Sequence, residues 1–372
     1  MSALALLLAL PGVWSLLTTS SLAAVRMKRR VNRAPTRGLS VLKPLCGADP
    51  SLEHNLRSFF EQDHPNFELL FGAQRADEPA LEVVRRLQRE YPDVASRIIV
   101  HNFSEGLNPK VRNLRGMLPV ARFPLLLISD SNVRAPRQYL SEAAAELEAD
   151  PTIGLVTHLF AGIGGTTFAA EIEHVQLAGF VAGGAAMPSL VGHAAVIGKS
   201  MLMSREHLEA VGGLAGVSDV LAEDYVLGQR LAQHGLRVAI GRTVLQNVVG
   251  EMSPRDLVER YARWSMMRRR LCPAAFALEP LASPLLLLPV AFHVLGFSAI
   301  LWALAIWFVR DVLALSILGR AASPQVLLVS PARDLAMLVA WGIALFTRHV
   351  SWRGTRVRVG QGTVLRALAT SR

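Results

Sequence analysis

Residues that suit group-transfer chemistry lie in two stretches of the chain. Glu223 and Asp224 form an acidic pair, and Arg260, Arg263 and Trp264 follow later. A carboxylate can take the proton of an acceptor hydroxyl, and guanidinium groups bind the oxygens of a departing diphosphate. Residues three and four positions apart share a helix face, so the two arginines and the tryptophan can point together. The two stretches therefore suit the two halves of one transfer site.

Each stretch also has a simpler explanation. Acidic residues are favoured at a helix start by the helix dipole, and arginine with tryptophan is typical of a helix at a membrane surface. If Asp224 is a catalytic base, Glu223 would make it a stronger one, because the neighbouring negative charge raises the pKa of Asp224. Both explanations stay open at the level of these residues alone.

Three further polar groups follow predicted strands. Asp130 ends an apolar strand, and Mg²⁺ bridging a diphosphate prefers such oxygen ligands. Asp77 and Glu78 can accept hydrogen bonds from the base or ribose of a nucleotide. Lys110 can add a cation to the same phosphates. The alternative for the acidic groups is a structural turn or a helix cap.

Alternating strand and helix patterns predict how these groups are positioned. The strands are expected at 39–45, 67–74, 96–102 and 124–132, and the helices at 51–62, 80–91 and 108–121. Such repeats predict an α/β fold with a mainly parallel sheet, whose ligands bind beyond the carboxyl ends of the strands. Residues 151–200 contain a further strand and a glycine-rich, helix-like stretch that fits either a core or a membrane surface.

Apolar residues concentrate at the two ends of the chain. The sequence of 372 residues is 51% hydrophobic and only 18% charged. Residues 1–25 carry no charged side chain and can cross a hydrocarbon core of about 30 Å. Basic residues follow this stretch rather than precede it, which favours an uncleaved anchor with the main domain in the cytosol.

The remaining segments complete a three-span prediction, in which Arg333 and Asp334 interrupt the last apolar run. The expected parts are an anchor at 1–25, a basic linker at 26–37, a catalytic domain at 38–275, a transmembrane helix at 283–309, a second C-terminal membrane segment at 310–347 and a basic cytosolic tail at 348–372. The net charge of +10 is distributed beside the apolar runs, which argues against a nucleic-acid partner. Two cysteines, Cys46 and Cys272, are too few for a disulfide framework.

The ordered motifs resemble those of the ceramide glucosyltransferases, which are membrane-bound, inverting enzymes of the GT-A type. The resemblance covers nearly the whole chain and includes GLNPKVRNL, LLISDSNVR, LAEDYVLGQRLAQHGLR and RYARW. It implies that Asp130 is the second of the family's three aspartates and that Asp224 is the third, the catalytic base. It also implies that Arg260, Arg263 and Trp264 form the family's (Q/R)xxRW signature.

Two positions depart from the family pattern. The first aspartate falls on Glu78, with Asp77 adjacent, so either acid is a candidate for the nucleotide contact. Asn132 stands where many GT-A enzymes carry the last carboxylate of a DxD motif. A metal would then depend on Asp130 and on the diphosphate itself.

The resemblance implies a GT-A domain that transfers glucose from UDP-glucose to the primary hydroxyl of ceramide, with Mg²⁺ or Mn²⁺ held through the UDP diphosphate. The implied partners are a UDP-sugar donor, a lipid acceptor and the bilayer. Two alternatives remain. One is a hopanoid lipid glycosyltransferase that uses UDP-N-acetylglucosamine, and the other is an inactive membrane scaffold that keeps the GT-A fold.

Overall fold

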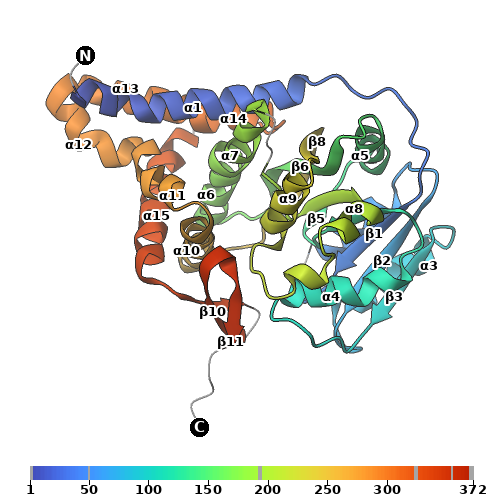
Figure 1. Ribbon diagram of the computed structural model, residues 1–372. Coiled ribbons are helices and arrows are strands. Elements are labelled where there is room, and N and C mark those ends of the chain that lie inside the picture. The colour runs from blue at the N-terminus through green and yellow to red at the C-terminus, as the bar shows by residue number, and fades with distance from the viewer. Residues whose placement is uncertain (1–2, 49–50, 192–194, 322–325, 353–354, 368–372) are drawn as a thin grey trace, which may run out of the picture. The chain divides into compact units, whose positions relative to one another are not determined.

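The computed structural model describes residues 3–48, 51–191, 195–321, 326–352 and 355–367. The chain divides into two compact units, which are labelled by their elements in Figure 1. The sheet unit comprises Met27–Phe160 and Pro188–Gly250. The helical unit comprises Met1–Arg26, Ala161–Met187 and Glu251–Arg372.

The sheet unit is built on eight strands in the order β3-β2-β1-β4-β7-β6-β8-β5. The strands are β1 Leu39–Pro44, β2 Phe67–Ala73, β3 Ser96–Val100, β4 Leu125–Ser129, β5 Val133–Arg134, β6 Ile153–Ile163, β7 Ser200–Ser204 and β8 Arg237–Val248. Strands β1, β2, β3 and β4 pair in parallel, whereas β7 is antiparallel to both β4 and β6, and β5 is antiparallel to β8. The expected strands at 39–45, 67–74, 96–102 and 124–132 are confirmed as β1 to β4, with slightly shorter bounds.

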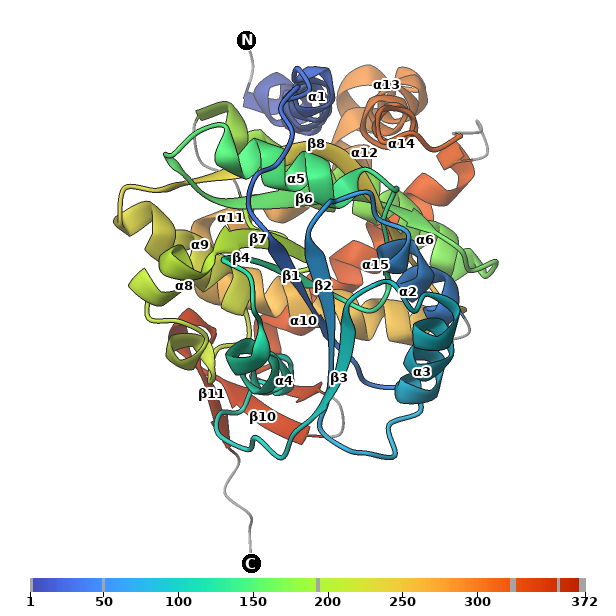
Figure 2. The same cartoon turned by 90° about the vertical axis from the view of Figure 1, so that its right-hand side faces the viewer.

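Helices cover both faces of the eight-stranded sheet. They are α2 Leu52–Phe60, α3 Ala80–Glu90, α4 Pro109–Met117, η1 Leu118–Val120, α5 Tyr139–Glu148, η3 Met187–Val191, α8 Arg205–Ala210, η4 Ala215–Val217 and α9 Glu223–Gln233. Figure 2 shows α2 and α3 to one side of β1 to β3 and α4 to the other. The three predicted helices correspond to α2, α3 and α4.

Two hydrophobic clusters explain this layering. Val41 belongs to a cluster with Leu56 of α2 and Val84 of α3, whereas its neighbour Leu42 packs in a second cluster with Leu114 of α4. Successive side chains of a strand point to opposite faces of the sheet, so the neighbours Val41 and Leu42 let β1 contribute to both clusters. Burial on both faces fixes the carboxyl ends of the strands, where the candidate site residues lie.

The helical unit contains the apolar ends of the chain. Its helices are α1 Ala3–Met27, α6 Phe168–Gln176, η2 Leu177–Ala182, α7 Gly183–Ala186, α10 Pro254–Leu271, α11 Pro273–Leu278, η5 Glu279–Ala282, α12 Pro284–Leu295, α13 Ser298–Trp307, η6 Phe308–Leu313, α14 Ala314–Ile317, α15 Val326–Phe346 and η7 Gln361–Thr363. A small antiparallel sheet has the strand order β11-β10-β9, with β9 His349–Trp352, β10 Thr355–Val359 and β11 Leu365–Ala367.

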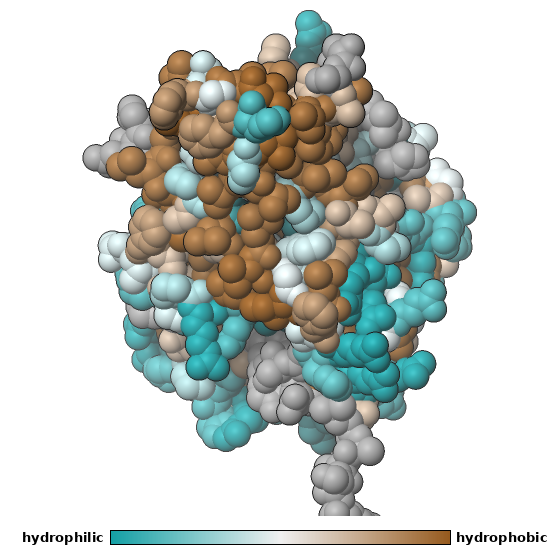
Figure 3. Space-filling model, turned by 90° about the vertical axis from the view of Figure 1, so that its left-hand side faces the viewer, coloured by the Kyte–Doolittle hydropathy of each residue, from teal (hydrophilic) through white to brown (hydrophobic). Residues whose placement is uncertain are grey.

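Three described helices are long and apolar enough to cross a membrane. They are Ala3–Met27, Ser298–Ile317 and Val326–Phe346, and a bent pair, Pro273–Ala282 with Pro284–Leu295, would make a fourth if it counts as one span. Figure 3 shows a broad hydrophobic surface on the side where α12, α13 and α15 lie. Exposed apolar side chains of α12, α13 and α15 include Leu286, Leu301, Leu335 and Phe346, and Phe297 is exposed between α12 and α13.

The single helix expected at 283–309 differs from the structure. The chain breaks between α12 and α13 at Gly296, whose φ of 57° and ψ of −141° favour glycine. At about 1.5 Å per residue, α12 is too short to cross a hydrocarbon core of about 30 Å alone. The apolar run therefore contributes its second half to the candidate span Ser298–Ile317 and its first half to the bent pair.

Candidate active site

A cluster of charged side chains occupies the carboxyl-end edge of the sheet unit. Lys110, in the first turn of α4, places its Nζ 3.1 Å from Asp130 Oδ1 and 3.1 Å from Glu223 Oε1. The same ammonium donates to the carbonyl of Gly198 at 2.8 Å. The backbone N–H of Gly198 in turn donates to Asp224 Oδ2 at 2.8 Å. Three of the predicted site residues, Lys110, Asp130 and Asp224, are thus brought together.

Asn108 fixes the two helix starts that carry this cluster. As the N-cap of α4, its Oδ1 accepts from the backbone N–H groups of Lys110 at 2.9 Å and Val111 at 3.1 Å. Its Nδ2 donates to Val220 O at 2.7 Å and to Glu223 Oε2 at 3.1 Å. An asparagine before proline is a favoured helix start, which is the sequence signal for this residue. The link to α9 is a tertiary contact that this signal does not contain.

The charges in this cluster shift the pKa values of Lys110 and Asp130 in opposite directions. Burial alone would lower the pKa of Lys110, but the charges of Asp130, Glu223 and Asp224 outweigh it and raise that pKa. Burial would raise the pKa of Asp130, and the ammonium groups of Lys110 and Lys199 instead lower it. Lys110 is therefore a fixed cation and Asp130 a fixed anion at neutral pH.

Asp224 has a different environment from Asp130. Burial, followed by the negative charge of Glu223, raises the pKa of Asp224 to about 6, although Lys110 opposes the shift. The like-charge effect of Glu223 was expected from the sequence, and burial proves to be the larger cause. A carboxylate whose pKa lies near 6 is mostly ionised at neutral pH and is a better proton acceptor than an ordinary aspartate.

Asp130 is flanked by further cations. Lys199 Nζ lies 3.5 Å from Asp130 Oδ2 and donates to Asn132 Oδ1 at 2.9 Å. Lys43 is fully buried and donates to Ser129 Oγ at 3.1 Å and to Asp130 O at 2.9 Å. Among the described residues, no group of three His, Cys, Asp or Glu side chains is placed to hold a metal ion. Asp130 and Asn132 offer hard oxygen atoms, so a cation at this place depends mainly on oxygens of the substrate.

The two acids after β2 have different contacts. Glu78 Oε1 accepts from the backbone N–H of Gly47 at 2.6 Å and so connects the ends of β1 and β2. Asp77 Oδ1 accepts from Arg75 Nε at 2.8 Å, and two thirds of its side chain is exposed. Both acids lie at the predicted edge, and their nucleotide contact stays a prediction.

The arginine and tryptophan signature lies on α10 of the helical unit. The helix starts with a capping box, in which Ser253 Oγ accepts from Asp256 N at 3.2 Å. Arg260 Nη1 donates to Glu173 Oε1 at 3.0 Å, and Glu173 is a buried partner that the sequence did not indicate. Arg263 forms no ion pair with any described residue. Burial and the charge of Arg260 lower the pKa of Arg263.

Trp264 packs edge to face against Tyr261, with ring centroids 5.2 Å apart. Arg260, Arg263 and Trp264 thus share one helix, as the spacing predicted. Because Asp224 belongs to the sheet unit and Arg263 to the helical unit, the prediction that their side chains share one pocket remains a prediction.

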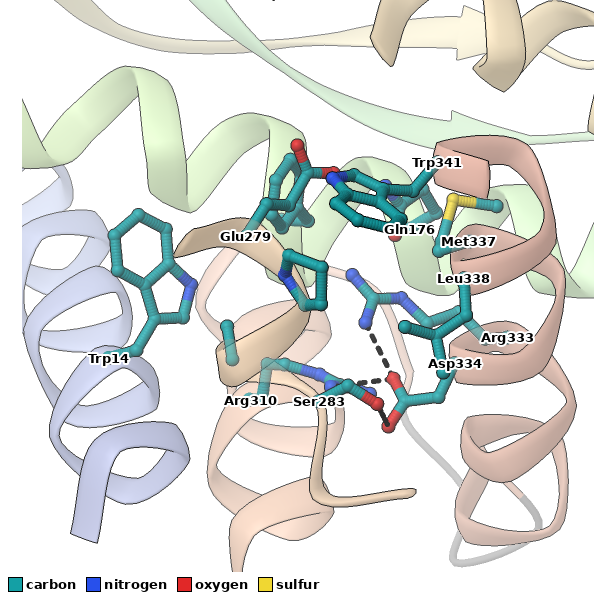
Figure 4. Close-up of a pocket in the computed structure, with 13 residues that line it drawn as sticks. Trp14, Gln176, Glu279, Ser283, Arg310, Arg333, Asp334, Met337, Leu338 and Trp341 are labelled. Atoms are coloured by element: carbon teal, nitrogen blue, oxygen red, sulfur yellow. Dashed lines mark hydrogen bonds and ion pairs between the residues drawn. The ribbon is translucent and has the colours of Figure 1, made fainter. Parts of the chain in front are cut away.

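A polar cavity of about 30 Å³ lies within the helical unit (Figure 4). Asp334 of α15 pairs with Arg333 at 2.7 Å and with Arg310 of η6 at 2.8 Å, and Arg310 also pairs with Asp311 at 2.8 Å. Ser283 Oγ and Trp307 Nε1 each donate to Asp334 Oδ2 at 3.0 Å. The buried pair Arg333 and Asp334, which interrupts the last apolar run, is therefore neutralised inside the protein.

Within the described part of the chain, three buried polar atoms of residues lining this cavity have neither a hydrogen-bond partner nor an ion pair. They are the donors Trp14 Nε1 and Arg333 Nε and the acceptor Gln176 Oε1. Arg310 Nη1 also lacks a hydrogen bond, but it pairs with Asp334 Oδ1 at 2.8 Å. The two arginines and two aspartates of the network cancel in charge, and Glu279, which also lines the cavity, pairs with Arg268 at 2.6 Å. The cavity thus suits one neutral polar group that both accepts and donates hydrogen bonds.

The fold is similar to that of a solved sugar-transferring enzyme. A mannosyltransferase from Pyrobaculum calidifontis, solved in complex with GDP-Man and Mn²⁺, superposes with a TM-score of 0.50 and 19% sequence identity. The match covers 91% of this chain and 99% of that one. The expected GT-A-type fold, with apolar helices near both ends of the chain, is confirmed.

The family model of glycosyl transferase family 21 matches residues 4–365, and the chain belongs to that family. Ceramide glucosyltransferase 1 of Caenorhabditis elegans is 31% identical over 258 residues, which are 69% of this chain and 55% of that protein. The ceramide glucosyltransferase of Komagataella phaffii is 38% identical over 100 residues, which are 26% of this chain and 20% of that protein. The resemblance to this family is therefore confirmed, although the chain spans about half the length of the nematode relative.

Proposed function

We propose that the protein is an inverting glycosyltransferase that moves glucose from UDP-glucose to the primary hydroxyl of ceramide. The observation that carries this proposal is the partly buried carboxylate of Asp224, whose pKa is raised to about 6 beside a fixed cation, Lys110. Membership of glycosyl transferase family 21 and the likeness to ceramide glucosyltransferases support the choice of reaction and acceptor.

Asp224 acts as the general base in this proposal. Its carboxylate accepts the proton of the acceptor hydroxyl while the hydroxyl oxygen forms a bond to the anomeric carbon of the sugar. The bond from that carbon to the diphosphate oxygen breaks on the opposite face, and UDP leaves with the bonding electron pair. The anomeric configuration is thereby inverted, which gives a β-linked product from an α-linked donor.

Basic residues stabilise the charge that develops on UDP. Arg263, which has no acidic partner among the described residues, binds the diphosphate oxygens, and Arg260 and Trp264 complete the signature. Asp77 or Glu78 contacts the nucleoside, and Lys110 and Asp130 lie beside the phosphates. A divalent cation, Mg²⁺ or Mn²⁺, would supply further positive charge to the diphosphate, with Asp130 as its protein contact.

The acceptor is a lipid with a neutral polar head. The cavity of Trp14, Gln176 and Arg333 offers two donors and one acceptor and has room for about one such group. An amide or hydroxyl group of ceramide can bond with these donors and this acceptor. A charged phospholipid headgroup would find no opposite charge there, because the arginines and aspartates of the cavity already neutralise one another. The sheet unit faces the cytosol in this proposal, and the apolar helices hold the enzyme in the bilayer.

The test is an assay of the purified full chain with a panel of UDP-sugars and lipid acceptors, in which products are identified by mass. UDP-glucose with ceramide is expected to give glucosylceramide. A product only from UDP-N-acetylglucosamine and a hopanoid would establish the alternative acceptor and donor. The absence of lipid-dependent UDP release with every pair would support an inactive scaffold and overturn the proposal.

A further inference from the structure

Five arginine side chains line one cavity of the helical unit, where α10 and α15 end and the small sheet begins. They are Arg269, Arg270, Arg348, Arg358 and Arg366. The cavity measures about 650 Å³, which lies within the range of about 300 to 1,000 Å³ that ligand sites occupy. The other lining residues are Leu345, Phe346, Val359, Gly360 and Gln361, so no acidic side chain lines it. We call this cavity the arginine pocket.

The charges of the arginine pocket are not neutralised within the described part of the chain. None of the five arginines forms an ion pair with a described acidic residue. Arg269 donates to the backbone carbonyls of Leu345 and Thr347, which holds the ends of α10 and α15 together without cancelling its charge. Arg270 Nε is buried and has no hydrogen-bond partner. Burial and the charges of Arg270 and Arg348 lower the pKa of Arg269.

Five like charges around one space repel one another, and a bound anion relieves this repulsion. Guanidinium groups match phosphate oxygens in pairs of hydrogen bonds and stay charged at any physiological pH. The pocket therefore fits a ligand that carries a phosphate group.

The apolar side of the pocket indicates which kind of phosphate. Phe346 and Leu345, which line it, are 86% and 38% exposed. Exposed residues Leu335, Val339 and Ile343 continue from Phe346 along one face of α15, a candidate membrane span. This face belongs to the hydrophobic side of the helical unit seen in Figure 3. Basic residues at the end of an apolar helix are a recurrent site for anionic lipid headgroups.

We propose that the arginine pocket binds the phosphate headgroup of an anionic phospholipid, whose acyl chains lie along the exposed face of α15. The site is separate from glycosyl transfer, because it uses none of the residues assigned to the sugar donor or the acceptor. A soluble phosphate shares the headgroup chemistry but lacks chains for Phe346 and the α15 face.

The experiment is native mass spectrometry of the full chain in a non-ionic detergent with phosphatidylglycerol or phosphatidylcholine of matched chain length. Wild type is expected to retain phosphatidylglycerol at least about tenfold more tightly, and the double variant Arg358→Gln/Arg366→Gln to lose about tenfold or more of that affinity. Arg85→Gln/Arg89→Gln makes the same charge change on exposed arginines of α3 and should leave binding unchanged. Arg358→Lys/Arg366→Lys keeps the charge but cannot form the paired hydrogen bonds of a guanidinium group, so it should lose less affinity than the glutamine pair.

Three results would overturn the proposal. The first is equal retention of phosphatidylglycerol by wild type and the glutamine pair. The second is an equal loss of affinity in the glutamine pair and in the control Arg85→Gln/Arg89→Gln, because the effect would then not come from the arginine pocket. The third is full displacement of the lipid by millimolar inorganic phosphate or UDP, which would identify a site for soluble anions. Melting temperatures equal to that of wild type establish that each variant is folded.

Discussion

The backbone of Gly198 joins Asp224, the candidate base, to Lys110, the central cation of the site. Its N–H donates to Asp224 Oδ2 at 2.8 Å, and its carbonyl accepts from Lys110 Nζ at 2.8 Å. A Cβ atom at this position would lie 2.6 Å from Asp224 Oδ2. The absence of a side chain therefore permits the close approach that orients the carboxylate.

Gly198→Ala is expected to reduce turnover at least about tenfold. The new methyl group would displace the carboxylate of Asp224, and a displacement of about 1 Å at a reacting group lowers the rate by that factor or more. UDP binding should change little, since the substitution moves the base and not the arginines of α10. Steady-state kinetics and UDP titration measure the two effects. Gly184→Ala is the matched control, because a Cβ there meets no atom within 4 Å. Equal turnover in the two variants would contradict the role of Gly198.

The pH dependence of kcat/KM should show an acid limb near pH 6. A base works only when deprotonated, and the pKa of Asp224 is raised to about 6, so activity rises as the pH increases through that value. Glu223→Gln removes the second cause of the raised pKa and should move the limb to lower pH. A limb that stays in place in this variant, or moves to higher pH, would mean that another group titrates.

Lys110→Gln should lower the free energy of unfolding more than Lys199→Gln does. The variant leaves Asp130 and Glu223 without their shared cation. Removal of one partner from a fully buried ion pair costs about 3 to 5 kcal/mol, and these partly exposed pairs should cost less than that. A lower melting temperature in detergent measures the effect. Lys199→Gln is the comparison, with one ion pair to Asp130 at 3.5 Å, and should cost less. The reverse order would contradict the central position of Lys110.

Gln176→Leu tests the polar cavity as a contact for the acceptor. The variant removes the unpartnered acceptor Oε1 and should raise the KM for ceramide severalfold while the KM for UDP-glucose stays unchanged. Gln233→Leu, at the end of α9, serves as a control for a glutamine outside the cavity. An equal rise of both KM values would show a general loss of structure instead.

The strands and helices of the sheet unit could be predicted because their pattern is local. Strand β1 places an apolar side chain on each face of the sheet, and the helices after β1 and β2 repeat the amphipathic spacing. The break at Gly296 escaped prediction because one glycine within an apolar run does not alter the hydropathy that identifies a span.

The site was predictable in its residue types and less so in its contacts. The sequence indicates Asp130, Lys110 and Asp224 as site residues, and the contact of Lys110 with phosphates stays a prediction. The ion pairs of Lys110 with two carboxylates, Asp130 and Glu223, could not be predicted from the sequence. Gly198 and Glu173 were missed because their importance arises from contacts 26 and 87 residues away in sequence. The arginine pocket likewise combines residues of α10 with residues of the C-terminal sheet.

The most direct test of the account is the turnover of Asp224→Asn with UDP-glucose and ceramide, measured beside its affinity for UDP. Asparagine keeps the shape of the side chain and cannot accept the proton. The account predicts a loss of about 100-fold or more in kcat with UDP affinity within about twofold of wild type. Turnover close to that of wild type would contradict the assignment of Asp224 as the base.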